Sequence, residues 1–226
     1  MPQNTLIELI NLEKTYKVGE QKIKVLKQIN LNISKGEFIS IMGPSGSGKT
    51  TLMNIIGMLD TPTSGGYFLD GNDIAHEDDD TLSRLRNRFI GFIFQSFYLI
   101  PYSTVLENVL LPIYYSGKDL KHYAELAKEL LKQVGLYDKR NNKPNQLSGG
   151  QQQRVAIARA LINDPEIILA DEPTGQLDSE TAKGIMDYLS LLNNKGKTII
   201  LVTHDITTAN YAKRIIKIAD GIIVSA

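Results

Sequence analysis

The chain has 226 residues, enough for one sizeable α/β domain or for a core with a small appended subdomain. Its 25 Lys and Arg residues balance its 25 Asp and Glu residues, so the formal net charge is zero and gives no overall electrostatic reason to expect nucleic-acid binding. Cysteine is absent, which excludes disulfides, iron–sulfur clusters and thiolate zinc sites and suits a reducing cytoplasm. The sequence has no secretory signal and no apolar run near the roughly 20 residues that cross a bilayer. We therefore expect a soluble protein that reaches a membrane only through a partner.

The first third of the chain predicts a small, mostly antiparallel sheet around one strand–loop–helix unit. Alternating apolar residues predict the strands, and turn residues separate them. The expected strands are 5–12, 23–26, 29–33, 38–42 and 67–69, with a turn at 16–20, a hairpin turn at 70–71 and a helix over 51–57.

A phosphate-binding loop lies between the strand 38–42 and the helix 51–57. It matches the pattern G-x-x-x-x-G-K-[ST] at every fixed position and is followed by Thr51. Its residues are Gly43, Pro44, Ser45, Gly46, Ser47, Gly48, Lys49 and Thr50. In such a turn the backbone N–H groups and the helix N-terminus point at the anion, the lysine reaches the β- and γ-phosphates, and the threonine hydroxyl holds Mg²⁺. The structural alternative, a glycine-rich turn that binds nothing, does not account for the lysine and the threonine, so we predict binding of a nucleoside triphosphate with Mg²⁺.

The middle of the chain is helical. Residues 78–88 predict a helix with an acidic entry, and 89–94 predict a buried strand that ends at Gln95. Three helices are then expected: 103–111, capped by Ser103 and stopped before Pro112; 119–134, ended by Gly135; and 151–162.

After residue 163 strands and helices alternate again. The expected elements are the strand 167–170, the helix 179–192 and the strands 198–202, 215–218 and 222–224. This order predicts an α/β fold, with a parallel core of the phosphate-loop NTPase type, an N-terminal antiparallel β subdomain and a helical insert. We place the β subdomain and core at 1–94 and 164–226 and the helical part at 95–163, all within one domain.

Two carboxylates, Asp171 and Glu172, end the apolar strand 167–170. Catalytic groups lie at the carboxyl ends of buried parallel strands. An aspartate there suits Mg²⁺, and a neighbouring glutamate can polarise an attacking water. Such a strand alone favours a structural interpretation, but downstream of a phosphate loop it favours a nucleotide site.

The segment Leu147-Ser148-Gly149-Gly150-Gln151 opens the helix 151–162. It can be a helix cap with a flexible turn, or a second phosphate site made of free N–H groups and a hydroxyl. A single nucleotide does not need two such sites in one chain, so the second would serve a nucleotide held by another copy.

Taken together, these motifs resemble those of the ATP-binding-cassette (ABC) ATPases, in the order of that family. The phosphate loop is followed by Gln95, the 147–151 signature, the Asp171-Glu172 strand, the loop 175–178 and His204. The resemblance runs from Tyr16 to about residue 221.

The resemblance implies roles for the nucleotide-contacting residues. Tyr16 would stack on adenine, although an ordinary strand-edge tyrosine is the alternative. Gln95 would contact Mg²⁺ or water and sense a transmembrane partner, with Thr50 and Asp171 as the other metal ligands. Glu172, His204 and Lys49 would be catalytic, with His204 bonding the γ-phosphate.

The resemblance also implies a dimer interface. Ser148 and Gly150, with Gly149 and Gln151, would face the γ-phosphate bound by the opposite subunit. Asp178 would cross the interface, although helix capping explains it equally well.

Three segments, 52–60, 94–97 and 149–154, are similar to the branch with macrolide exporters (MacB) and lipoprotein-release ATPases (LolD). This implies an ATPase that forms a homodimer on binding ATP at the cytoplasmic face of the inner membrane. It would drive separate transmembrane permease subunits with a large periplasmic domain, and no nucleic acid is expected. The end of the chain at Ala226 leaves open a fragment of a fused exporter, and Gln176 departs from the expected asparagine. Residues 97–102 fit a groove for the membrane partner or internal packing.

The remaining alternative is a single-cassette ATPase that regulates a membrane process such as cell division. A small-molecule kinase is disfavoured because it has no need of the signature.

Overall fold

The computed structural model describes residues 4–116 and 118–225. The chain divides into two compact units: unit 1 runs up to Arg86 and resumes at Leu192, and unit 2 is Asn87–Leu191. Each unit is described by itself.

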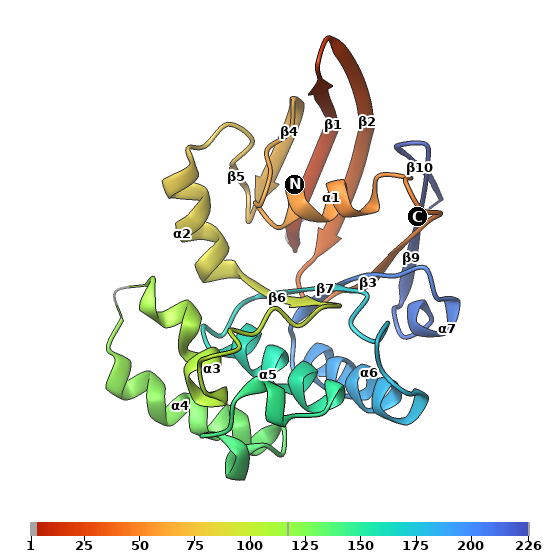
Figure 1. Cartoon of the computed structure of the whole chain (residues 1–226). Helices are drawn as coiled ribbons and strands as arrows, with labels where there is room; N and C mark the ends of the chain where they lie inside the picture. Colours follow the sequence, from red (N-terminus) through yellow and green to blue (C-terminus); the bar gives the residue numbers. More distant parts are fainter. Residues whose placement is uncertain (1–3, 117, 226) are drawn as a thin grey trace. The chain divides into compact units, whose positions relative to one another are not determined.

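Unit 1 contains an antiparallel sheet with the strand order β2-β1-β4-β5 (Figure 1). Its strands are β1 (Thr5–Val18), β2 (Gln21–Ser34), β4 (Ser64–Leu69) and β5 (Asn72–Asp73). The predicted antiparallel region and the turn between β4 and β5 are confirmed.

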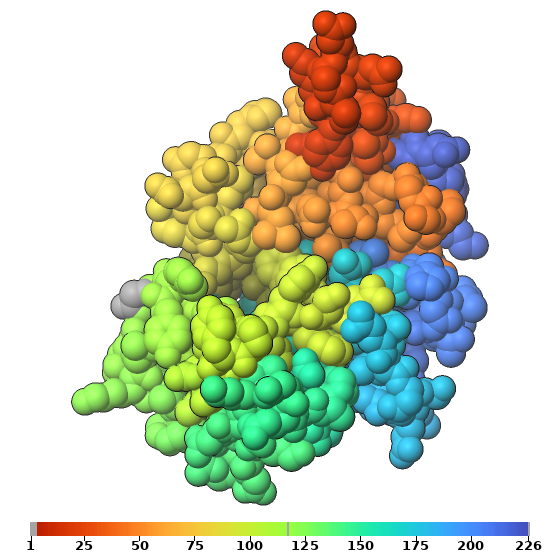
Figure 2. Space-filling view, viewed as in Figure 1, coloured from red at the N-terminus to blue at the C-terminus, as the bar shows by residue number. Residues whose placement is uncertain are grey.

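The β1–β2 hairpin is longer than predicted. The expected turn at 16–20 is wrong for its first residues, because β1 continues to Val18 and Tyr16 pairs with Ile23. The two strands predicted at 23–26 and 29–33 form the single strand β2, since register shifts absorb the breaks in alternation. The exposed end of this hairpin stands clear of neighbouring atoms in Figure 2.

A second sheet in unit 1 carries the predicted parallel core. β3 (Phe38–Met42) pairs in parallel with β8 (Thr198–Val202) on one side and with β9 (Arg214–Ala219) on the other. β10 (Ile222–Ser225) pairs antiparallel with β9. All five residues of β8 and four of the five in β3 are buried, as expected for parallel strands in a core.

Three helices accompany these strands, α1 (Lys49–Ile56), α2 (Asp79–Phe89) and α7 (Ile206–Ala209). The acidic entry predicted for α2 is confirmed, because Asp78 Oδ1 accepts a 2.7 Å hydrogen bond from the Thr81 amide. Burial of Leu52, Met53, Ile55 and Ile56 fixes the inner face of α1.

Unit 2 combines two parallel strands with a group of helices. β6 (Ile90–Phe94) and β7 (Ile167–Asp171) pair with Phe94 opposite Asp171. The helices α3 (Val105–Tyr114), α4 (Leu120–Gln133) and α5 (Gly149–Leu161) contact one another (Figure 1). Two 3₁₀ turns, η1 (Tyr137–Lys139) and η2 (Pro144–Gln146), join α4 to α5, and α6 (Ser179–Asn194) follows β7.

The predicted ends of α3 are wrong at both termini. Thr104, not Ser103, caps the helix, and Glu107 completes a reciprocal capping box. Pro112 lies inside the helix, which ends at Tyr114, because a proline in the last turn removes only one helical hydrogen bond. The prediction for α4 is confirmed, with Asp119 as its cap.

In the described part of the chain, we find no helix with the length and hydropathy of a membrane span.

Candidate functional site

The phosphate loop joins β3 to α1, and its shape depends on glycine. Gly46 and Gly48 have φ angles of 77° and 102°, in the left-handed region that side chains disfavour. A Cβ on Gly43 would lie 2.1 Å from the Ile218 carbonyl oxygen, and one on Gly48 would lie 2.9 Å from Leu26 Cδ2. Only a chain without side chains at these positions forms this loop.

Several groups in the loop suit a phosphate. No side chain in the described part of the chain caps α1, and the first N–H groups of a helix have no partner within it. Ser47 Oγ is buried and has no hydrogen-bond partner among the described residues. Lys49 Nζ donates 2.8 Å hydrogen bonds to the Gly43 and Pro44 carbonyls, so the ammonium lies over the loop. Triphosphate oxygens match this set of donors.

His204 lies at the same sheet edge as the phosphate loop. β3 and β8 are parallel neighbours, so the segments that follow them leave from the same end of the sheet. The phosphate loop follows β3, and His204 follows β8 and is exposed. Asp205 then caps α7 by accepting hydrogen bonds from the Thr207 and Thr208 amides, which fixes the chain beside His204.

Tyr16 lies in β1, three residues before the turn that connects it to β2. Its hydroxyl donates a 2.6 Å hydrogen bond to Asp60 Oδ2, and Lys14 Nζ lies 4.9 Å from its ring centroid. Partial burial and the bond to Asp60 raise the pKa of Tyr16. At 37% exposure, the side chain keeps surface free for a stacking partner.

In unit 2 the predicted metal-site residues lie on neighbouring strands. Phe94 and Asp171 are paired, so Gln95 and Glu172 follow equivalent positions of β6 and β7. A Cβ on Gly175 would lie 2.8 Å from Gln95 Nε2, so the loop after Glu172 passes close to the Gln95 amide. Unit 2 therefore brings Gln95, Asp171 and Glu172 together.

The signature segment has a local structural role in this chain. Ser148 caps α5 in a box with Gln151, whose amide donates a 3.3 Å bond to Ser148 Oγ. A Cβ on Gly150 would lie 2.3 Å from Thr181 Cγ2, so glycine permits α5 to approach the start of α6. The serine itself is exposed.

Asp178 caps α6. Its Oδ1 accepts a 3.0 Å hydrogen bond from the Thr181 amide, and this bond lowers the pKa of the carboxyl. The capping explanation is therefore correct locally, and a role at a dimer interface stays a prediction.

Two side-chain contacts of α5 were not predicted. The Gln153 amide nitrogen donates to the Pro173 carbonyl at 2.6 Å, and the Arg159 guanidinium donates to the Phe97 and Tyr98 carbonyls. Both residues belong to an apolar-periodic helix in which polar side chains are usually assigned to the surface. Their only sequence signal is a polar residue at a position of the buried face.

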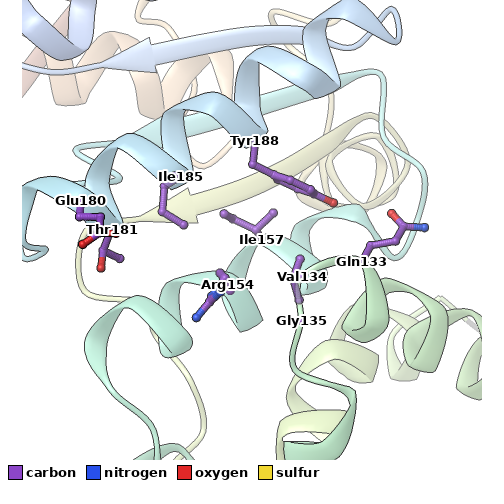
Figure 3. Close-up of a pocket in the computed structure, with 10 residues that line it drawn as sticks. Gln133, Val134, Gly135, Arg154, Ile157, Glu180, Thr181, Ile185 and Tyr188 are labelled. Carbon is purple, nitrogen blue, oxygen red and sulfur yellow. The ribbon is translucent and has the colours of Figure 1, made fainter.

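A cavity of about 500 Å³ lies within unit 2, lined by residues of α5, α6 and the end of α4 (Figure 3). Val134, Ile157, Ile185 and Tyr188 form apolar parts of its wall, and Arg154 and Glu180 also line it. None of the predicted site residues lines this cavity.

The described residues contain no cluster of three or more His, Cys, Asp or Glu side chains that could hold a metal ion. Mg²⁺ bound to a nucleotide needs few protein ligands, because phosphate and water oxygens supply the rest. The predicted ligands are hard oxygen donors, which fit this ion; Thr50 belongs to unit 1, and Gln95 and Asp171 belong to unit 2.

Comparison with known proteins identifies the class. Residues 26–175 match the family model described as ABC transporter. The chain therefore belongs to the ABC transporter family, as an ATP-binding cassette that hydrolyses ATP.

Individual relatives are similar over nearly the whole chain. It is 53% identical to the uncharacterized ABC transporter ATP-binding protein YknY of Bacillus subtilis, covering 98% of this chain and 96% of that protein. It is 50% identical to the macrolide export ATP-binding/permease protein MacB of a Shewanella species, covering 97% of this chain but only 34% of that protein.

A solved structure confirms the fold. The cassette MJ0796, whose sequence comes from Methanocaldococcus jannaschii, was solved as a dimer in a post-hydrolysis state bound to ADP and Pi. It matches with a TM-score of 0.89 and 52% identity over 97% of each chain. The predicted α/β fold, with its phosphate-loop core, antiparallel subdomain and helical insert, is thereby confirmed.

Proposed function

We propose that this chain is the ATPase subunit of a MacB- or LolD-like transporter that works as a head-to-tail dimer on separate transmembrane subunits. The observation that carries the proposal is the phosphate loop, with its glycine-dependent shape and, among the described residues, no side-chain cap on α1 and no hydrogen-bond partner for the Ser47 hydroxyl. The similarity to both MacB and the dimeric MJ0796 cassette supports the branch and the assembly.

The bound nucleotide would be held from both sides of the dimer. Lys49 and the α1 N-terminus would bind the β- and γ-phosphates of one ATP, while Ser148 and Gly150 of the other copy would face the same γ-phosphate. Tyr16 would stack on adenine. The exposure of Ser148 and the free face of Tyr16 leave both residues accessible for these contacts.

Hydrolysis would depend on positioning and charge rather than on a covalent intermediate. Glu172 would orient and deprotonate the attacking water, and His204 would hydrogen-bond the γ-phosphate. Mg²⁺, held by Thr50, Gln95 and Asp171, would neutralise phosphate charge when bound.

The transmembrane partner would dock beside Gln95. Tyr98 and Tyr102 follow it on a surface segment and are 65% and 77% exposed. Large exposed aromatic side chains are typical of protein interfaces. Such a partner would place the chain at the cytoplasmic face of the membrane, and its cargo would be set by the permease.

The test replaces the proposed base. We expect Glu172→Gln to lower the rate of phosphate release by at least about 100-fold, the usual minimum contribution of a general base. In Mg-ATP the variant should also form a dimer, detected by light scattering, because ATP is bound but not turned over.

The matched control is Glu166→Gln, at the exposed residue just before β7. It should keep the activity of the unaltered chain. Undiminished phosphate release by Glu172→Gln would show that another group activates the water.

A further inference from the structure

Gln153 links α5 to two loops that carry proposed active-site residues. Its side chain is fully buried, and its Nε2 donates a 2.6 Å hydrogen bond to the Pro173 carbonyl and lies 3.5 Å from the Phe94 carbonyl. Both neighbours are acceptors, so the amide must present its nitrogen to them. Pro173 directly follows Glu172, and Phe94 directly precedes Gln95.

The Glu172 backbone needs such support. Its φ of 44° lies in the left-handed region, which non-glycine residues adopt only when their surroundings hold them there. The Glu172 carbonyl accepts a 3.1 Å hydrogen bond from the Gly175 amide. The next carbonyl, that of Pro173, is the one that Gln153 holds.

Core stability alone does not explain an amide at this position. Gln153 Oε1 is buried and has no hydrogen-bond partner among the described residues. A buried, unsatisfied acceptor costs free energy, so the directed bond from Nε2 is what the residue contributes.

We propose that Gln153 is a positioning residue, which transmits the placement of the signature helix α5 to the Glu172 backbone. Ser148, the cap of α5, lies just over one helical turn before Gln153. A nucleotide that contacts Ser148 and Gly150 thereby sets the orientation of Glu172 through a rigid helical segment and one hydrogen bond. The inference rests on the proposed role of Glu172 as the base.

The test compares Gln153→Met with Gln152→Met. Methionine has a similar length but no donor. The neighbouring Gln152 amide nitrogen donates a 3.2 Å hydrogen bond to the carbonyl of Leu147, the residue before the cap of the same helix. We expect Gln153→Met to lower kcat at least tenfold with a change in KM for ATP below about twofold, because only the alignment of the reacting groups is lost. Gln152→Met should stay within about twofold of the unaltered chain in both constants.

A double-mutant cycle separates positioning from general damage. If Gln153 acts through Glu172, adding Gln153→Met to Glu172→Gln lowers the residual rate by less than about twofold, and the ATP-driven dimer still forms. The inference would be overturned if the fall in kcat of the double variant equalled the product of the two single falls. An unchanged kcat in Gln153→Met would overturn it as well.

A second variant guards against unfolding. Gln153→Asn keeps the amide but withdraws it from the Pro173 carbonyl, so we expect the same fall in kcat with normal circular dichroism. Full activity in this folded variant would also overturn the inference. Failure of the proposed function is distinguishable, because then Glu172→Gln itself retains full activity.

Discussion

At the scale of single residues, Asp60 organises the surroundings of Tyr16. Its carboxylate accepts hydrogen bonds from Lys14 Nζ at 2.5 Å and from the Tyr16 hydroxyl at 2.6 Å. Burial would raise the pKa of Asp60, but these hydrogen bonds outweigh burial and hold the pKa below its usual range. The ring proposed to stack on adenine is therefore held in place through its hydroxyl. The sequence could not predict this hydrogen bond, because Tyr16 and Asp60 are far apart in the chain.

We predict that Asp60→Asn lowers the free energy of unfolding by about 1–2 kcal/mol at pH 7, since it weakens two charge-assisted hydrogen bonds. The folded pKa lies below the unfolded one, so the contribution of Asp60 is fully present above the unfolded pKa near 4 and is lost as the pH falls through the folded pKa. Urea unfolding of the unaltered chain and of Asp60→Asn between pH 7 and 3 measures the difference in their free energies of unfolding. A difference between the variants that persists at the acid end would contradict the assignment.

At the scale of elements, the helix α5 shows what the sequence could and could not predict. Its start was recognisable, because a serine followed three residues later by a glutamine is a capping pattern. The contacts of Gln153 and Arg159 were not, since each partner is a backbone carbonyl in a loop distant in sequence. The cap of α3 was predicted one residue too early, although Thr104 followed three residues later by Glu107 is the same capping pattern and was recognisable in the sequence.

Arg159 holds the loop after Gln95 in an unusual conformation. Phe97 and Tyr98 have φ angles of 56° and 47°, and their carbonyls accept hydrogen bonds of 2.6 and 2.5 Å from the two Nη atoms of Arg159. Burial lowers the pKa of Arg159 to about 10, so it stays charged at neutral pH. A planar, forked donor suits two adjacent carbonyls better than an ammonium does.

We predict that Arg159→Met lowers the free energy of unfolding by about 2–3 kcal/mol, because it removes two hydrogen bonds from a charged donor, of which the one to the Phe97 carbonyl is part-buried. Cleavage by chymotrypsin after Phe97 and Tyr98 should also become faster. Arg154→Met is the control on the same helix, because the buried Arg154 Nε has no hydrogen-bond partner among the described residues. An equal loss of unfolding free energy in the two variants would show that packing of the helix, and not the pair of hydrogen bonds from Arg159, supports the loop.

At the scale of the whole molecule, the predicted site residues are distributed over the two units. The phosphate loop and His204 belong to unit 1, and Gln95, the signature and Glu172 belong to unit 2. The order of motifs predicted all of these residues, but not the borders of the units. The borders fall within α2 and α6, where no glycine- or proline-rich linker marks them in the sequence.

A dimer that closes on ATP couples folding to association. We predict that the Tm of Glu172→Gln in Mg-ATP rises by roughly 1–3 °C when the protein concentration increases tenfold, since that increase is worth about 1.4 kcal/mol per dimer. Without nucleotide the Tm should not depend on concentration. Lys49→Ala in the same background is the control, because it loses the lysine that holds the phosphates and should melt at one temperature at both concentrations. A Tm that rises with ATP yet is equal at both concentrations would mean that a single copy binds the nucleotide without closing on a second.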